Sequence, residues 1–334
     1  MPAARDSNDA WSGKHAPSGR SADLILQADA ITRRFDSVVA VDRLTFDVTR
    51  GELFGLVGPD GAGKTTTLRM LAGVLPPSEG DASILGMSVA REPERVKPHI
   101  AYMAQRFGLY EDLTVRENLD FHADLYRVPR GERPARLERL YVFSRLGEFE
   151  NRLAGALSGG MKQKLALSCC LIHQPDLLLL DEPTFGVDPI SRRDLWLILH
   201  QMVADGVTVI VSTSYLDEAE RCDRVVLLDA GRVLALDAPG TLQGTLPGRL
   251  FEVVITSPRE ARDALREDPD VRSVTMFGQT LHVQLGAAAE MGDAKRILAQ
   301  HGLAAERVIG IEASLEDVFL DRVGQKQRSA EVVS

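Results

Sequence analysis

The segment GPDGAGKTT at 58–66 contains the residue types that bind a polyphosphate. Gly58, Gly63, Lys64 and Thr65 occupy the fixed positions of the pattern G-x-x-x-x-G-K-[ST]. Glycines let consecutive backbone N–H groups turn toward one anion, and the N-terminus of a following helix adds partial positive charge. We expect Lys64 to reach the β- and γ-phosphates of a nucleotide and the Thr65 hydroxyl to bind Mg²⁺. The residues expected to surround the phosphates are Gly58, Pro59, Asp60, Gly61, Ala62, Gly63, Lys64, Thr65 and Thr66.

Two adjacent acids, Asp181 and Glu182, follow a run of four leucines at 177–180. A continuous apolar run of this kind is typical of a strand buried on both faces of a parallel sheet. Ligands bind at the carboxyl ends of such strands. We therefore expect Asp181 to hold Mg²⁺, directly or through water, and Glu182 to orient and deprotonate an attacking water.

A third segment, LSGG at 157–160, precedes a helical pattern at 161–173. Ser158, Gly159 and Gly160 would again place backbone N–H groups at a helix N-terminus, this time without a lysine. The segment therefore predicts a second phosphate-binding surface in the same domain.

These three segments, in this order, resemble the ATP-binding cassette (ABC) ATPase family over about residues 24–240. The resemblance implies ATP and Mg²⁺ as cofactors. It also implies roles for four further residues in matching segments. These are Phe35 stacking on adenine, Gln105 linking a helical insert to the Mg²⁺ site, Asp188 in FGVDP at 185–189, and Ser214 in the switch region at 211–233.

The family resemblance also implies partners. In this family two cassettes pair head to tail, and each nucleotide lies between the loop at 58–66 of one cassette and the LSGG segment of the other. Fragments such as YMAQRFGLYEDLTVRENL at 102–119 and ASLEDVFL at 313–320 resemble export-type ATPases of the multidrug or daunorubicin type, which drive a separate membrane permease. The chain would then lie in the cytoplasm, on the inner face of the membrane, in a homodimer or a heterodimer.

Two residues depart from the family pattern. Asp60 stands where the family usually has asparagine, and it adds a carboxylate near a polyphosphate. Ser214 stands where the family usually has a histidine that contacts the γ-phosphate and the attacking water. Serine can hydrogen-bond, but it supplies neither a cation nor a long reach. Two interpretations stay open: turnover is merely slow, or this site is degenerate and the cassette pairs with a consensus partner.

The expected fold is α/β: a P-loop ABC ATPase core, with a mixed sheet flanked by helices and a helical subdomain, followed by a small α+β domain. The apolar run at 53–57 and the helical pattern at 66–74 supply the strand and helix that the phosphate loop needs. After Pro239 the elements follow the order β-α-β-β-α-β, the split-βαβ arrangement. This second domain could stabilise the dimer or sense a ligand. The expected parts are a disordered tail at 1–22, the nucleotide-binding domain at 23–245 with its helical subdomain at about 106–157, the accessory domain at 246–326, and a disordered tail at 327–334.

The composition fits a globular protein, with 44% hydrophobic and 26% charged residues. A net charge of −9 argues against a nucleic-acid partner. No apolar run approaches the roughly 18 residues that span a bilayer, so a membrane role requires a partner. Two other functions remain as alternatives: a soluble ABC ATPase that acts on ribosomes or DNA, and a nucleotide-gated structural partner with little turnover of its own.

Overall fold

The computed structural model describes residues 24–106 and 108–331, and the expected N-terminal tail at 1–22 lies outside them. The chain divides into two compact units between Val233 and Leu234. This division comes earlier than the boundary expected after residue 245. The reason is that α8 (Pro239–Gly244) contacts α11 (Leu315–Glu331), and Arg322 Nη2 donates a hydrogen bond to Thr245 Oγ1 at 3.0 Å.

The C-terminal end also differs from the expected tail at 327–334. Helix α11 continues through Glu331. Its last residues, QKQRSAE at 325–331, are mostly good helix formers, so a polar composition here continues a helix.

The first unit is built on a six-stranded sheet of order β10-β9-β3-β8-β7-β6. The pairs β3–β8, β3–β9, β7–β8 and β6–β7 are parallel. Every residue of β3, β7 and β8 is buried, which explains their continuous apolar runs. The strands are β3 (Leu53–Val57), β6 (Ile100–Met103), β7 (Leu177–Asp181), β8 (Thr208–Thr213), β9 (Arg224–Asp229) and the edge strand β10 (Arg232–Asp237).

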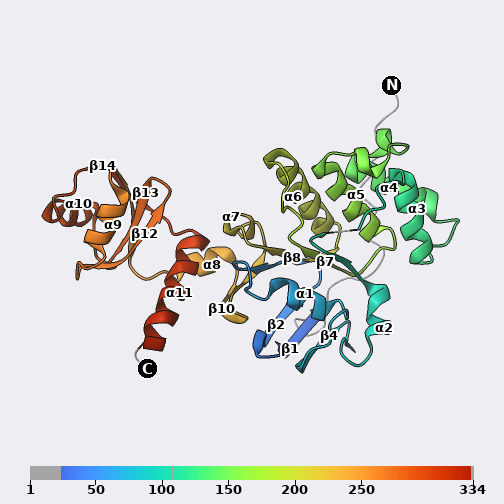
Figure 1. Cartoon of the computed structure of the whole chain (residues 1–334), viewed down its shortest axis with the longest axis horizontal. Coiled ribbons are helices and arrows are strands. Elements are labelled where there is room, and N and C mark those ends of the chain that lie inside the picture. Colours follow the sequence, from blue (N-terminus) through green and yellow to red (C-terminus); the bar gives the residue numbers. More distant parts are fainter. Residues whose placement is uncertain (1–23, 107, 332–334) are drawn as a thin grey trace. The chain divides into compact units, whose positions relative to one another are not determined.

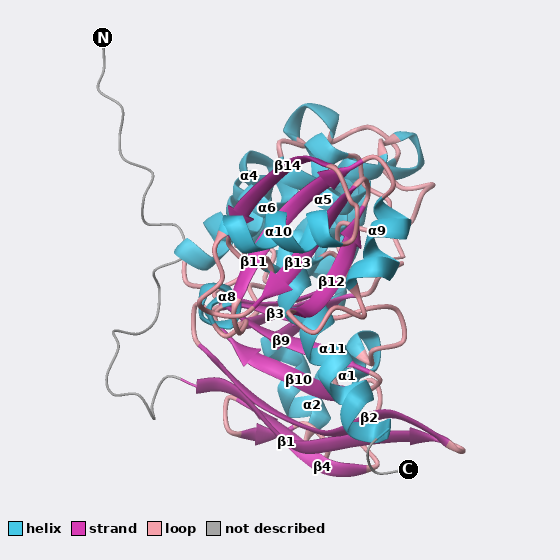
Figure 2. Cartoon of the chain, turned by 90° about the vertical axis from the view of Figure 1, so that its left-hand side faces the viewer, coloured by secondary structure: helices cyan, strands magenta, loops and turns pink. Residues whose placement is uncertain are grey.

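A second, antiparallel sheet of order β2-β1-β4-β5 forms another layer of this unit (Figure 2). Its strands are β1 (Leu24–Phe35), β2 (Val38–Thr49), β4 (Glu79–Ile84) and β5 (Met87–Ser88). Phe46 of β2 stacks on Phe54 of β3, with ring centroids 5.3 Å apart. The two sheets therefore share one core. Phe35 is the last residue of β1.

The helices α3 (Val115–Leu125), α4 (Arg133–Ser144) and α5 (Gly159–Leu171) gather away from β1, β2 and β4 (Figure 1). Both α3 and α4 pack against α5. Thr114 and Glu117 form a reciprocal capping box that fixes the start of α3. We refer to these three helices as the helical subdomain; α3 and α4 lie within residues 106–157, where the sequence predicts it, and α5 follows that range. The remaining helices of the unit are α1 (Lys64–Leu71), α2 (Pro93–Val96), α6 (Pro189–Ala204) and α7 (Leu216–Ala219).

The second unit has the predicted β-α-β-β-α-β order. Its antiparallel sheet has the order β12-β13-β11-β14, and α9 and α10 cover one face (Figure 2). On α11, Asp317 Oδ1 lies 2.7 Å from His282 Nδ1, while its other oxygen accepts hydrogen bonds from Ser314. The elements are β11 (Arg249–Ile255), α9 (Pro258–Leu265), β12 (Val271–Phe277), β13 (Thr280–Leu285), α10 (Met291–Gln300) and β14 (Ala305–Ile311).

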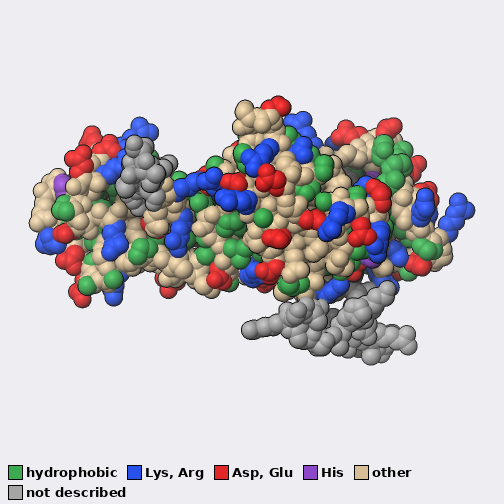
Figure 3. Space-filling view, turned by 90° about the horizontal axis from the view of Figure 1, so that it is seen from below, with side chains coloured by type: hydrophobic (Ala, Val, Ile, Leu, Met, Phe, Trp, Pro, Cys, Tyr) green, Lys and Arg blue, Asp and Glu red, His purple; other side chains and the backbone are tan. Residues whose placement is uncertain are grey.

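Among the described residues, no helix is both long and apolar enough to cross a lipid bilayer. On the face drawn in Figure 3, acidic and basic side chains are interspersed on the surface.

Candidate nucleotide-binding site

The phosphate loop connects β3 to α1 through two glycines with left-handed backbone, Gly61 at φ 80° and Gly63 at φ 96°. Close approach of other segments also requires glycine here. A Cβ atom on Gly63 would lie 2.6 Å from the carbonyl oxygen of Ala40, and one on Gly58 would lie 2.2 Å from that of Leu228. The loop therefore depends on glycine for both its turn and its packing.

Lys64 folds back over the phosphate loop. Its Nζ donates to the carbonyl oxygens of Gly58 at 2.7 Å and Pro59 at 3.1 Å, and it lies 3.1 Å from Oε1 of Glu182. The side chain is only 5% exposed. The ammonium group is thus held between the phosphate loop and Glu182, the residue that directly follows β7.

Hydroxyl groups donate hydrogen bonds to both carboxylate oxygens of Asp181. Its Oδ1 accepts from Thr65 Oγ1 at 3.0 Å and from Ser212 Oγ at 2.9 Å, and its Oδ2 accepts from the Tyr102 hydroxyl at 3.2 Å. Burial, followed by the nearby Asp181 carboxylate, raises the pKa of Tyr102 to about 12. Tyr102 therefore keeps its proton and remains a donor to this carboxylate.

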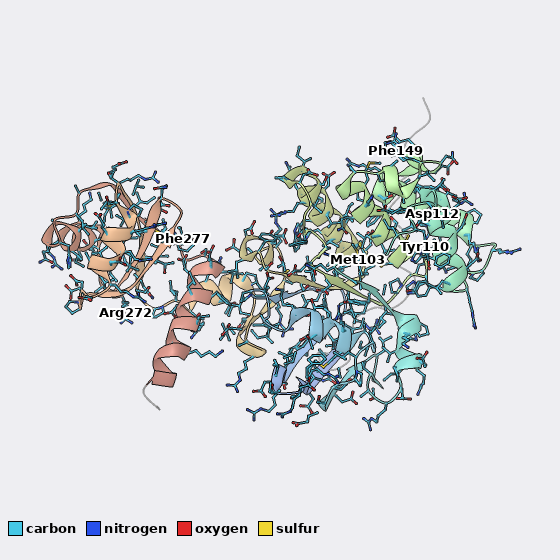
Figure 4. The ribbon with its side chains drawn as sticks, viewed as in Figure 1. Met103, Tyr110, Asp112, Phe149, Arg272 and Phe277 are labelled. Atoms are coloured by element: carbon cyan, nitrogen blue, oxygen red, sulfur yellow. The ribbon has the colours of Figure 1, made fainter. Side chains whose placement is uncertain are left out.

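Glu182 has a left-handed backbone with φ 47°, which costs a non-glycine residue of order 1–3 kcal/mol. Its backbone N–H donates to Ser212 Oγ at 3.0 Å, and its Oε2 accepts from Gln105 Nε2 at 2.9 Å. In the sequence, Gln105 follows Met103, the last residue of β6, and precedes Tyr110. Figure 4 labels Met103 near the sheet and Tyr110 near the helical subdomain. One side chain thus joins Glu182 to the segment that leads into that subdomain.

A hollow of about 370 Å³ opens beside these groups. Phe35, 42% exposed, stands at its rim, and the Arg33 guanidinium covers one face of the ring at 4.6 Å from the centroid. Most of the predicted site residues line this hollow: Phe35, Asp60, Gly61, Ala62, Gly63, Lys64, Thr65, Thr66, Gln105 and Glu182.

Four predicted residues lie elsewhere, at the N-termini of α5 and α6. Ser158 caps α5 by accepting from the Met161 N–H at 3.3 Å. Asp188 caps α6, and hydrogen bonds from Ser191 hold the pKa of its carboxyl below the usual value. A Cβ atom on Gly160 would lie 2.3 Å from Ser191 Oγ, whereas one on Gly159 would meet no atom of this chain within 4 Å. Gly160 therefore serves helix packing, and Ser158 and Gly159 are exposed.

Comparison with known proteins agrees with this geometry. A profile of the family described as ABC transporter matches residues 41–185. The Nod factor export ATP-binding protein I of Burkholderia thailandensis is 35% identical over 300 residues, which cover 89% of this chain and 96% of that protein. This chain belongs to the ABC transporter family. The relative just described is named as an export ATP-binding protein.

Another relative of the cassette is the probable multidrug ABC transporter ATP-binding protein YbhF of Escherichia coli (strain K12), 41% identical over 308 residues. The alignment covers 90% of this chain and 52% of YbhF, so the chain spans about half the length of that relative. A solved ATP binding subunit of an ABC transporter superposes with a TM-score of 0.60 at 33% identity, covering 66% of this chain and 92% of that one. A dimeric post-hydrolysis structure of the ATP-binding cassette MJ0796, bound to ADP and Pi, gives a TM-score of 0.58 at 25% identity, covering 64% and 98%.

The cassette also contains functional contacts that sequence reasoning missed. Tyr102 and Ser212 bind the two acids, and Thr213 binds the Gly58 N–H through its carbonyl oxygen at 3.3 Å. The sequence feature that could have indicated the contacts of Ser212 and Thr213 is a pair of hydroxyl residues at the end of an apolar strand, as in TVIVST at 208–213. Ser214, the next residue, is half-buried and does not line the hollow.

The groups of this cassette fit a magnesium–nucleotide complex. Within 24–106 and 108–331, no cluster of three or more His, Cys, Asp or Glu side chains could hold a metal alone. Asp181 and Thr65 instead offer oxygens side by side, which suits Mg²⁺ because this ion usually takes one or two protein ligands together with substrate phosphates. In the same described part of the chain, no side chain caps α1 at Gly63, so its first N–H groups remain available to an anion.

Proposed function

We propose that this cassette binds and hydrolyses Mg²⁺–ATP and thereby drives a membrane exporter. The observation that carries the proposal is the convergence of five polar side chains: four of them line one hollow, and Asp181 accepts a hydrogen bond from one of these four, Thr65. The five side chains are Lys64, Thr65, Gln105, Asp181 and Glu182.

Each of these side chains has a distinct task in the proposal. Lys64 would neutralise charge on the β- and γ-phosphates, and Thr65 and Asp181 would hold Mg²⁺. Glu182 would orient water and accept its proton, and Gln105 would fix that carboxylate while contributing to the metal site. Phe35 offers its free ring face to adenine. Mg²⁺, when bound, supplies charge neutralisation at the phosphates.

A second cassette is part of the proposal, as a copy of this chain or a related one. Ser158 and Gly159 are exposed and do not line the hollow of their own chain. An exposed helix N-terminus with this composition suits the γ-phosphate held by an opposite cassette. We propose that Ser158, Gly159, Gly160 and Asp188 act across such an interface.

A membrane permease is the other proposed partner, with the cassette peripheral on the inner face of the cell membrane. The helical subdomain exposes Phe121 and Leu125 of α3, and Tyr110 meets Phe121 edge to face at 4.6 Å. Aromatic and aliphatic side chains of this kind favour a protein contact. The names of the relatives, multidrug transport and Nod factor export, favour a transport role over an action on ribosomes or DNA. The net charge of −9 argues in the same direction.

One observation keeps a second candidate function, a nucleotide-gated partner with little turnover. Ser214 replaces the long, basic side chain that the family resemblance implies at the switch position. Such a chain would bind ATP and pair while its partner supplies most of the hydrolysis.

Substitution of Lys64 tests the proposed site. Lys64→Ala removes the cation from the loop, so affinity for ATP should fall about tenfold or more and phosphate release should cease. Lys97→Ala is the control, because Lys97 is exposed and lies outside the hollow. Equilibrium binding of labelled ATP and a phosphate-release assay would be measured on both variants. Unchanged binding and rate in Lys64→Ala would refute the site.

A further inference from the structure

Glu218 of α7 is a buried carboxylate with no role in the proposed catalytic set. Glu218 is only 1% exposed. Ionised side chains are rarely buried without partners, so the groups around this carboxylate matter. The segment after β7, the start of α6 and the end of β8 meet at this side chain. Their positions relative to the acids of the site suggest what the carboxylate does.

Two threonine hydroxyls donate to the same oxygen of Glu218. Thr213 Oγ1 lies 2.8 Å and Thr184 Oγ1 lies 2.9 Å from Oε2. Thr213 Oγ1 also accepts from the Tyr215 N–H at 3.0 Å. Because Thr213 donates to Glu218 and accepts from Tyr215, it closes the turn that contains Ser214.

The other oxygen of Glu218 faces α6. Arg192 Nε lies 3.4 Å from Oε1 without a well-aligned hydrogen bond, and the guanidinium lies 4.5 Å above the Tyr215 ring. Arg192 belongs to the first turns of the helix that Asp188 caps. Glu218 therefore also connects the Ser214 turn to the α6 N-terminus.

The two threonines flank the proposed chemistry. Thr184 follows Glu182 by two residues, and Thr213 immediately precedes Ser214. Their common acceptor joins the segment that follows Glu182 to the residue that precedes Ser214, beyond the last paired residues of β7 and β8. A serine depends on this connection more than a longer side chain would, because it cannot reach across a displacement.

We propose that Glu218 is a positioning residue that holds Ser214 at a fixed distance from Glu182 and ties both to the α6 N-terminus through Arg192. The proposal rests on the proposed ATP hydrolysis at this site. Hydrolysis should depend on Glu218, because misplacement of groups by about 1 Å can cost up to 10²-fold in rate. Binding of ATP should not, because Glu218 does not line the hollow.

Kinetics of the full-length chain test this division. Glu218→Ala and Thr213→Val should lower kcat about 10- to 100-fold in single-turnover phosphate release, with ATP affinity changed by less than about threefold. Glu218→Gln should lose less, since its amide oxygen still accepts from both threonines. Asp217→Asn, at an exposed neighbour on α7, is the control. Unchanged kcat in Glu218→Ala and Thr213→Val would overturn the proposal, as would equal losses of affinity and rate.

Hydrogen exchange supplies a readout that needs neither nucleotide nor turnover. In Glu218→Ala the amides of 213–219 should exchange faster than in the wild type, and Glu218→Gln should restore most of the protection. Equal exchange in all variants would overturn the proposal. A wild-type chain that fails to bind ATP would refute the proposed function, and exchange would still decide whether Glu218 holds this turn. If Glu218→Ala does not fold, Thr213→Val replaces it in both measurements, because valine has the shape of threonine but cannot donate to Glu218, and Glu218→Gln remains the variant that keeps both threonine contacts.

Discussion

At the scale of single residues, Ser214 is the departure from the expected family pattern with the larger chemical consequence. A serine hydroxyl can hydrogen-bond to a phosphate or to water, but it neither carries positive charge nor takes up a proton near neutral pH. The neighbouring acids keep their partners, since Glu182 still contacts Lys64 and Gln105. The chemistry lost at this position is therefore confined to what an imidazole adds.

Ser214→His should raise ATP hydrolysis if the rest of the site is competent. We expect a gain of about 10²-fold, the low end of what a positioned acid–base group contributes, because the neighbours are arranged around serine. Phosphate release by the purified chain would be measured, with Ser214→Asn as a control that is polar but does not take up a proton. A fast wild-type rate that Ser214→His does not raise would show that serine suffices. If both are slow, Asp60→Asn is the next substitution.

Sequence patterns predicted the residues of the hollow because a phosphate loop restricts residue type at fixed spacing. Lys64, Asp181 and Glu182 stand in such patterns. Tyr102 and Glu218 do not, because Tyr102 contacts Asp181 and Glu218 contacts Thr184, residues that are distant from them in the sequence. Such a partner can be assigned to a hydroxyl or a carboxylate only when the order of the strands in the sheet is known.

At the scale of elements, the cassette exposes two neighbouring helix N-termini whose backbones are close together. Ser158 caps α5, Asp188 caps α6, and Gly160 fits against Ser191. The sequence predicted a helix after LSGG, and α5 confirms it. The requirement for glycine at position 160 comes from the packing of α5 against α6, which no sequence pattern predicted. A Cβ atom on Gly160 would thus face Ser191 of α6, whereas one on Gly159 would face open space in this chain.

Gly160→Ala should destabilise the chain by about 1–3 kcal/mol, because its Cβ atom would overlap Ser191. Gly159→Ala is the matched control, since the same methyl group meets open space in this chain. Urea denaturation of both variants would give the difference in free energy of unfolding. Ser191→Gly added to Gly160→Ala should recover part of the loss. Equal stability of the two single variants would contradict the packing assigned to Gly160.

At the scale of the whole molecule, the hollow and the LSGG surface belong to one chain but do not meet within it. Residues 60–66 of the phosphate loop and Glu182 line the hollow, and Ser158 is absent from its lining. A site that needs both halves requires a second cassette. The split-βαβ order of the second unit was predictable because its strands alternate with helical patterns. The division at Val233 was not, because it depends on the contact of α8 with α11.

Glu182→Gln should trap ATP and stabilise a pair of cassettes. The amide still accepts from Gln105 but cannot take a proton from water, so binding persists while hydrolysis stops. Light scattering with and without Mg²⁺–ATP would measure the mass of this variant, alone and mixed with a candidate partner cassette. The mass should double on addition of ATP, and Glu182→Gln combined with Lys64→Ala should stay monomeric because the phosphates lose their main cation. A further control combines Gly159→Ala with Glu182→Gln. The methyl group added at position 159 lies where the nucleotide of the opposite cassette would approach, so this variant should gain less mass on addition of ATP. No gain of mass in any combination would refute pairing across Ser158 and Gly159, since ATP can shift the equilibrium only by binding the paired state more tightly.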